Sequence, residues 1–409
     1  MDYTVAMKTV FKKSFCLAAT ACGLFVILFS SCLSVPVQEG QTVIIQYYSQ
    51  GEKYFEKEYL QKERFELPED PVREGFTFNG WWVTCEKGVV PFDFYWLKEH
   101  LDDERITVNA RWLNASYTLE KLDAFNALSS TIQDGAIFGD YLFKFHSNGL
   151  CYVFSMETGA KVGGFSVSGT NDYMPHSNAV CFGNQYYDPN DEFPLLYANV
   201  YNNYNKDSYT DKRAGMLCVY RIQRDDTKFT STLIQVIRVG FADIEPWRSK
   251  WNAEKEAFTD RSPWGNFIID TDCNRLWAFV TRDDNHTTRF FSFDIPEINR
   301  NGVFSYVTLQ EDQVKSYFDI PYSWYLQGAC YHDGKIYSTE GMGTTDNPTR
   351  IRVVDLEHGI EDSVIDLYLY DNLMREAEFI DFKDDICYFG DYKKVNSSPT
   401  AYLYRISGV

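Results

Sequence analysis

Between residues 41 and 113 the hydrophobic positions alternate with polar ones. Alternation is clearest over 76–78, where Phe76 and Phe78 flank a threonine, and over 106–112, where every second residue is apolar. A period of two is typical of strands with one buried face. Proline and glycine punctuate the stretches between these runs, as turns require. The pattern predicts a small domain over 41–113, with Trp81 and Trp112 in its core because a domain of this size needs its large aromatics for burial.

This segment resembles the internalin-type B repeat, also called the Listeria-Bacteroides repeat. The matching positions of its P-x-x-P-x-R-x-G-[YF]-x-F-x-G-W signature and of the following A-x-W strand are Pro68, Pro71, Arg73, Gly75, Phe76, Phe78, Gly80, Trp81, Ala110 and Trp112. The stretch from Thr84 to Asp103 is longer than the family pattern. The resemblance implies a β-grasp-like fold and a spacer or adhesion role, without catalytic residues.

Residues 119–409 read as one short strand after another, separated by turn residues. A polar opening, an apolar strand, a turn and an aromatic-rich second strand recur in five segments: 133–145, 176–200, 264–280, 327–338 and 376–389. Four-stranded units repeated around an axis make a β-propeller. We therefore predict a mainly β chain whose domain at 119–409 is a five-bladed propeller, with six blades as the runner-up. Residues near 117–122 would supply the strand that closes the last blade.

The last two of these units resemble known bacterial propellers. The run Gln327-Gly328-Ala329-Cys330-Tyr331, the later Gly341 and the pair Glu376 and Glu378 are similar to propellers of the teichoic-acid biosynthesis protein C and phage receptor-binding type. They are similar, more loosely, to six-bladed lactonase-like propellers. These motifs support the fold more than any function.

The N-terminus has the order of an export signal. Lys8, Lys12 and Lys13 precede an apolar run that ends in Ser30-Ser31-Cys32, and such a run is shorter than the roughly 20 residues that a membrane span needs. It resembles a lipoprotein signal peptide, which implies a signal at 1–31, a lipid on Cys32 and a linker at 32–40. An ordinary cleaved signal and an uncleaved anchor helix are the alternatives. We expect an extracytoplasmic protein held on a bacterial membrane through its lipid, at the outer membrane or cell surface rather than the inner membrane.

The net charge of the chain bears on the class of partner that it can bind. The chain has 409 residues and a net charge of −19, and nucleic-acid binding needs a concentrated basic surface. We therefore expect no nucleic-acid partner.

In a propeller, the residues that open the inner strands converge at one end of the central channel. The polar residues at these openings are Asp134, His176, Asn178, Asn266, Gln327, Glu376 and Glu378. They predict a ligand-binding site, with calcium as a possible cofactor on the oxygen ligands of Glu376 and Glu378 and with His176 as a hydrogen-bond donor or acid/base group. The alternative interpretation is that a water-filled channel needs a polar lining whatever the protein does.

Two functions fit this sequence. The first is a lipid-anchored binding protein in which the B-repeat-like segment is a spacer and the propeller binds a glycan or a protein. The second is an extracytoplasmic enzyme, a hydrolase, lactonase or lyase acting on a cell-envelope polymer or small ester. We favour the binding protein.

Overall fold

Residues 42–114 form a small mixed sheet with one helix, which we call the N-terminal lobe. Its elements are β1 (Thr42–Ser49), β2 (Glu52–Leu60), β3 (Phe76–Cys85), β4 (Gly88–Pro91), α1 (Phe94–Glu99) and β5 (Arg105–Asn114). The strand order is β2-β1-β5-β3-β4, with β1 and β5 parallel and the other pairs antiparallel. Trp81 and Trp112 are 3% and 2% exposed within a separate apolar cluster, which confirms their predicted place in the core.

The computed structural model describes residues 42–61, 63–85, 88–123, 125, 132–168, 177–200, 216–240, 251–252, 257–258, 265–282, 287–323, 325–395 and 398–409. The predicted signal peptide, Cys32, the linker and His176 lie outside these residues. Residues 41–409 make up one compact unit. No helix among the described residues is long and apolar enough to cross a membrane.

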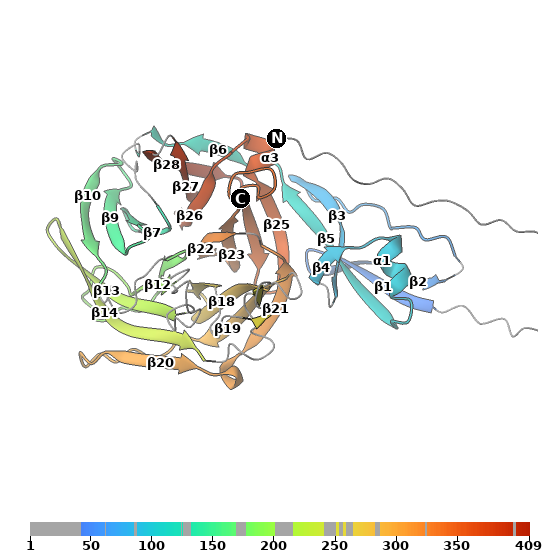
Figure 1. Ribbon diagram of the computed structural model, residues 1–409, viewed down its shortest axis with the longest axis horizontal. Helices are drawn as coiled ribbons and strands as arrows, with labels where there is room; N and C mark the ends of the chain where they lie inside the picture. The colour runs from blue at the N-terminus through green and yellow to red at the C-terminus, as the bar shows by residue number, and fades with distance from the viewer. Residues whose placement is uncertain are drawn as a thin grey trace, which may run out of the picture. The chain divides into compact units, whose positions relative to one another are not determined.

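The rest of the described chain is a propeller-like ring of antiparallel sheets (Figure 1). One sheet consists of β7 (Gly135–Phe138), β8 (Tyr141–Phe145), β9 (Leu150–Ser155) and β10 (Lys161–Ser166). The next consists of β11 (Val180–Phe182), β12 (Leu196–Val200), β13 (Met216–Asp225) and β14 (Lys228–Val239), with β20 (Ser305–Leu309) added in parallel at its outer edge.

The ring continues through three further sets of strands. The first is β17 (Gly265–Asp270), β18 (Arg275–Arg282), β19 (Thr287–Asp294) and β21 (Ser316–Pro321). A short hairpin of β15 (Trp251–Asn252) and β16 (Ala257–Phe258) precedes it in the chain, and the single turn η2 (Glu311–Gln313) leads into β21. The second is β22 (Leu326–His332), β23 (Lys335–Glu340), β24 (Arg350–Asp355) and β25 (Ile360–Asp366), followed by helix α3 (Leu367–Asp371). The third is β26 (Glu376–Lys383), β27 (Ile386–Val395), β28 (Ser398–Ser407) and β6 (Thr118–Lys121).

The inner strands close on themselves. Strand β7 contacts β11, β11 contacts β17, β17 contacts β22, β22 contacts β26, and β26 contacts β7. Each of the recurring sequence segments therefore contains an inner strand, as the pattern predicted. Strand β6 pairs with β28 at the outer edge of the last sheet, which confirms the predicted closing strand and leaves the ring without an open end there.

The predicted blade count needs correction. Four of the ring's sheets stand alone, rather than five or six, because β22–β25 is not a separate sheet. The outer strand β25 pairs in parallel with β5 of the N-terminal lobe through Val364 and Leu113. The two sets of strands thereby merge into one nine-stranded sheet.

Ion pairs reinforce this junction. Arg73 binds the Asp362 carboxylate at 3.1 Å, and Arg111 binds Glu361, which also binds Arg352. Arg352 is 3% exposed. A buried charge is costly unless it is paired. These ion pairs therefore favour a single arrangement of the lobe against the β22–β25 strands.

Candidate functional site

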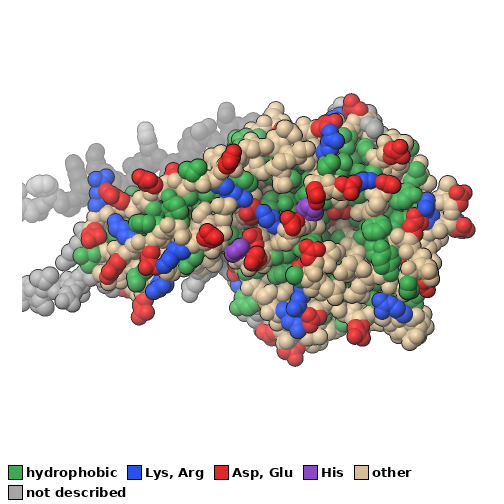
Figure 2. Space-filling view, turned by 180° about the vertical axis from the view of Figure 1, so that it is seen from behind, with side chains coloured by type: hydrophobic (Ala, Val, Ile, Leu, Met, Phe, Trp, Pro, Cys, Tyr) green, Lys and Arg blue, Asp and Glu red, His purple; other side chains and the backbone are tan. Residues whose placement is uncertain are grey.

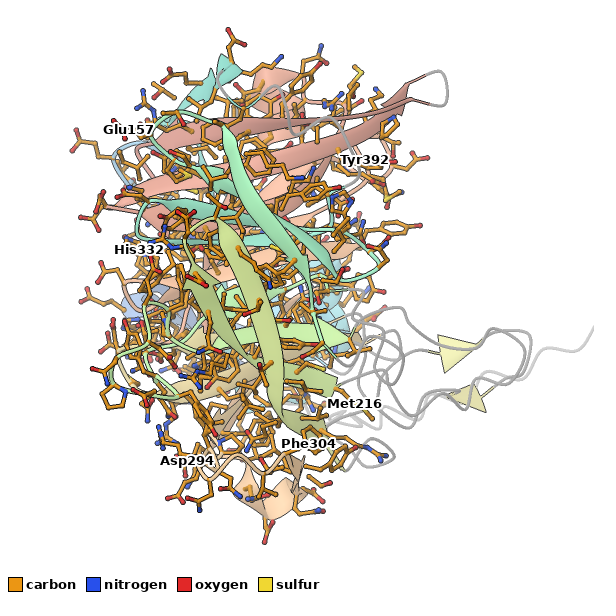
Figure 3. The ribbon with its side chains drawn as sticks, turned by 90° about the vertical axis from the view of Figure 1, so that its left-hand side faces the viewer. Glu157, Met216, Asp294, Phe304, His332 and Tyr392 are labelled. Carbon is orange, nitrogen blue, oxygen red and sulfur yellow. The ribbon has the colours of Figure 1, made fainter. Side chains whose placement is uncertain are left out.

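The strand openings lie at one end of the ring. Figure 3 shows Tyr392 and Met216 at this end, with Glu157 and His332 at the opposite end. Tyr392 pairs with Glu376, the first residue of β26, and Met216 is the first residue of β13, which runs in the same direction as β11. We call this end the opening face.

Buried carboxylates join neighbouring inner strands. Asp134 Oδ2 accepts a 2.6 Å hydrogen bond from the Val180 backbone N–H, which links the start of β7 to β11. Asp381 Oδ2 accepts a 2.6 Å hydrogen bond from the Ile137 N–H, which links β26 to β7. Side chains thus supply hydrogen bonds between inner strands that have no backbone ladder between them.

Amide side chains make the remaining links. Asn266 Nδ2 donates to the Gln327 carbonyl at 2.6 Å, and its Oδ1 accepts from Asn199 Nδ2 at 3.1 Å. Asn178 Nδ2 donates to the Leu326 carbonyl at 2.8 Å and lies 3.3 Å from Gln327 Oε1. The Asn178 bond therefore joins β11 directly to β22, with which it is also in contact, although β17 lies between them in the ring order.

Two adjacent inner strands carry irregular register at this face. In β22 the register shifts between Leu326 and Ala329, and in β26 it shifts between Ala377 and Phe379. The shifts leave Gln327, Gly328 and Glu378 without a cross-strand partner. Bulges of this kind re-aim side chains, and they are enriched next to functional sites.

Gly328 is required by the crowding at this point. A Cβ on Gly328 would lie 2.6 Å from the Glu378 carbonyl oxygen and 2.7 Å from Asp134 Oδ1. No real Cβ tolerates such contacts with backbone, so the position has room only for glycine. The missing side chain allows the backbone of β22 to approach both Asp134 and β26.

Two carboxylate oxygens in this region are buried without a hydrogen bond. Asp134 Oδ1 and Glu378 Oε2 have no partner among the described residues, although the two side chains are only 0% and 2% exposed. The Glu378 side chain also hydrogen-bonds that of Glu376, which is only half-buried. We call Asp134, Glu376 and Glu378 the carboxyl cluster.

Burial raises the pKa of every member of this cluster. Desolvation is the largest cause for Asp134, Glu376 and Glu378, and for Glu378 the neighbouring Glu376 adds to it. Desolvation also raises the pKa of Asp381 to about 7. A carboxylic acid that stays protonated near neutral pH can donate a hydrogen bond, and one that ionises there can accept a proton from a ligand.

The predicted site residues are therefore brought together in two groups. Asn178, Asn266 and Gln327 form the amide links, whereas Asp134, Glu376 and Glu378 form the carboxyl cluster. Gln327 and Glu376 are the partly exposed members of the two groups. His176 lies outside the described residues.

Sequence reasoning missed Asn199, Asp381 and Tyr392. Asn199 and Asp381 lie inside apolar strands rather than at strand openings. A lone polar residue within an apolar strand was the available signal, because a buried polar group needs a partner. Tyr392 lies beside the cluster, and the charges of Glu376 and Glu378 help burial to raise its pKa.

The described residues contain no group of three or more His, Cys, Asp or Glu side chains arranged to hold a metal ion. On the face shown in Figure 2, Lys and Arg side chains are interspersed with Asp and Glu side chains rather than gathered in one patch.

The fold defines a mainly β protein built on a propeller-like ring of sheets. No protein-family model matches the sequence, and no curated protein matches it. Among solved structures, the chain is similar to glutaminyl cyclase from Myxococcus xanthus, with a TM-score of 0.37 and 9% identity over 71% of this chain and 95% of that one. It is also similar to Sqt1 from Saccharomyces cerevisiae, with a TM-score of 0.29 and 7% identity over 66% of this chain and 56% of that one. Likenesses this distant carry no functional argument.

The raised pKa of Glu378 makes stability depend on pH. Its ordinary value is 4.5, and a carboxyl whose pKa is raised by folding stabilises the folded state below its unfolded pKa and loses that contribution as pH rises through the folded pKa. We expect Glu378→Gln, which mimics the protonated acid, to reduce this loss. The unfolding free energy of Glu378→Gln should match that of the wild type near pH 4 and exceed it near pH 8, where the wild type has to ionise a buried carboxyl or hold its proton at a cost.

The measurement is urea denaturation across this pH range. Glu99→Gln makes the same chemical change at an exposed position on α1 and should leave the pH profile as it is. A Glu378→Gln profile parallel to that of the wild type would show that Glu378 ionises normally.

Proposed function

We propose that this protein is a lipid-anchored binding protein on the extracytoplasmic side of a bacterial membrane, and that the opening face of its ring binds a glycan or a protein. Cys32 carries the lipid, and the N-terminal lobe is a B-repeat-like spacer with a β-grasp arrangement. The lobe's strand order β2-β1-β5-β3-β4, with parallel central strands β1 and β5, supports the β-grasp assignment.

One observation carries the binding proposal. Within the described part of the chain, Asp134 Oδ1 and Glu378 Oε2 are buried acceptors without a partner, and leaving such a group unpaired costs about 1–3 kcal/mol. A ligand that brings hydroxyl or amine donors removes this cost. Sugar hydroxyls and protein amines are such donors, and Gln327 and Glu376 are the partly exposed groups through which they reach the cluster.

A second candidate function is an enzyme acting on an envelope polymer or a small ester. The observation that favours it is the pair Glu376 and Glu378, whose pKa values are both raised by burial. Adjacent carboxyls with different exposure can divide the roles of acid and base. His176 would be a further acid/base group in this case.

The binding proposal is tested by calorimetry and on a glycan array with the purified chain, with and without calcium. We expect Gln327→Ala and Glu376→Gln to weaken binding at least about tenfold, because each removes a group through which the ligand enters. Glu157→Gln, at the opposite end of the ring (Figure 3), should bind as the wild type does.

Three results of this experiment separate the candidates. Unchanged binding in both opening-face variants would refute the site. Binding that requires calcium and is lost in Glu376→Gln would assign the ion to the carboxyl cluster. Turnover of a sugar lactone or aryl ester that is lost in the same variant would favour the enzyme instead.

The lipid anchor has its own test. Cys32→Ser should abolish incorporation of labelled fatty acid and release the protein from the membrane fraction of a bacterial host, since the thiol is the acylated group. A variant that stays labelled and membrane-bound would contradict the anchor at Cys32.

A further inference from the structure

A second hollow lies where the N-terminal lobe meets strands β23 and β24. Its volume is about 270 Å³, and its lining includes Trp82, Arg111, Tyr322, Asn347, Arg350 and Arg352. A smaller cavity of about 100 Å³ shares Trp82 and Arg111 with it. Trp82, which is only partly buried, thus borders both cavities. We call the larger one the junction pocket.

The charges around this pocket are already paired. Arg352 binds Glu340 at 2.9 Å and also binds Glu361, which binds Arg111. Arg350 binds Asp366 at 2.8 Å. Each guanidinium group therefore has a carboxylate of its own chain against it, and the pocket wall carries fixed dipoles with little net charge.

One donor in this wall lacks an acceptor. Arg352 is 3% exposed, and its Nη atoms donate to Glu340, Glu361, Pro321 O and Tyr322 O. Its Nε has no hydrogen-bond partner among the described residues. A buried unpaired donor of this kind is rare in folded proteins and calls for an enclosed water molecule.

Apolar surface completes the pocket. The Arg111 guanidinium stacks on the Trp82 ring at 4.5 Å from its centroid, which fixes the orientation of the indole. Tyr322, which belongs to the propeller-like ring of sheets rather than to the lobe, also lines this pocket. An indole with fixed orientation, next to amide and guanidinium groups, offers both a flat apolar face and directional hydrogen bonds.

We infer that the junction pocket binds a neutral sugar unit of a glycan. The inference rests on the proposed glycan-binding function and places a glycan subsite at the junction, separate from the carboxyl cluster. Trp82 stacks on the apolar face of the sugar ring, and the Arg350 and Asn347 side chains bind its hydroxyl groups.

The paired charges decide between a neutral and an anionic ligand. An anion would have to compete with Glu340, Glu361 and Asp366 for the same guanidinium groups, whereas a hydroxyl group binds without displacing them. The pocket therefore favours polyhydroxylated ligands without a carboxylate or phosphate.

The experiment is saturation-transfer NMR on the purified chain. The neutral probes are maltotriose, cellotriose and triacetylchitotriose, and the anionic probes are trigalacturonic acid and inorganic phosphate. We expect a neutral trisaccharide to bind, and Trp82→Ala to weaken that binding about tenfold through loss of the aromatic face. Asn347→Ala, at a partly exposed position, should weaken it less and should leave the fold intact.

Two control variants show whether a loss of sugar affinity comes from the junction pocket. Trp96 is another partly buried tryptophan of the lobe, which stacks on His100 rather than lining the junction pocket, so Trp96→Ala should keep the affinity if it folds. Glu376→Gln should also keep it, because Glu376 belongs to the carboxyl cluster. Thermal unfolding of each variant shows whether it is folded.

The outcomes decide between the two sites. Binding that is weakened about tenfold in Trp82→Ala and less in Asn347→Ala but kept in Glu376→Gln supports the junction subsite. Binding that is lost only in Glu376→Gln overturns it and leaves the carboxyl cluster as the glycan site. Failure of every neutral probe to bind, or tighter binding of the anionic probes, also overturns the junction inference without touching the proposal for the opening face.

Discussion

The ring depends on hydrogen bonds that run from the side chains of one sheet to the backbone of another. Asp134 accepts from Val180, Asp381 accepts from Ile137, and Asn266 donates to the carbonyl of Gln327. Inner strands of different sheets share no backbone ladder, so their polar groups need side-chain partners wherever water is excluded. These bonds join each inner strand to its neighbour in the ring.

The same constraint creates the candidate site. A carboxylate that bonds the backbone of a neighbouring strand is buried together with its second oxygen. In Asp134 this second oxygen has no hydrogen-bond partner among the described residues. The register shifts of β22 and β26 add Glu378 to this interior, and Gly328 leaves the space in which the two groups come close. Burial then raises their pKa values. The residues that join the sheets are thus also residues of the proposed binding site.

Sequence reasoning predicted the parts that depend on local periodicity. The core tryptophans of the lobe, the inner strands of the ring and the closing strand near residue 118 followed from alternation, turn residues and the need to cover a sheet edge. The merging of β25 with β5 was not predictable, because one parallel pair between Val364 and Leu113 depends on how two separately folded sheets meet. The register shift at Glu378 was likewise hidden, since an alternating strand and a bulged strand have the same composition.

The central claim is that burial raises the pKa values of the carboxyl cluster, and infrared spectroscopy of the carboxylic acid C=O stretch tests it most directly. In the purified wild-type chain at pH 7, we expect an absorption band of protonated carboxylic acid in a dry environment, part of which disappears in Glu378→Gln. A wild-type spectrum at pH 7 that contains only ionised carboxylates would contradict this account of the opening face.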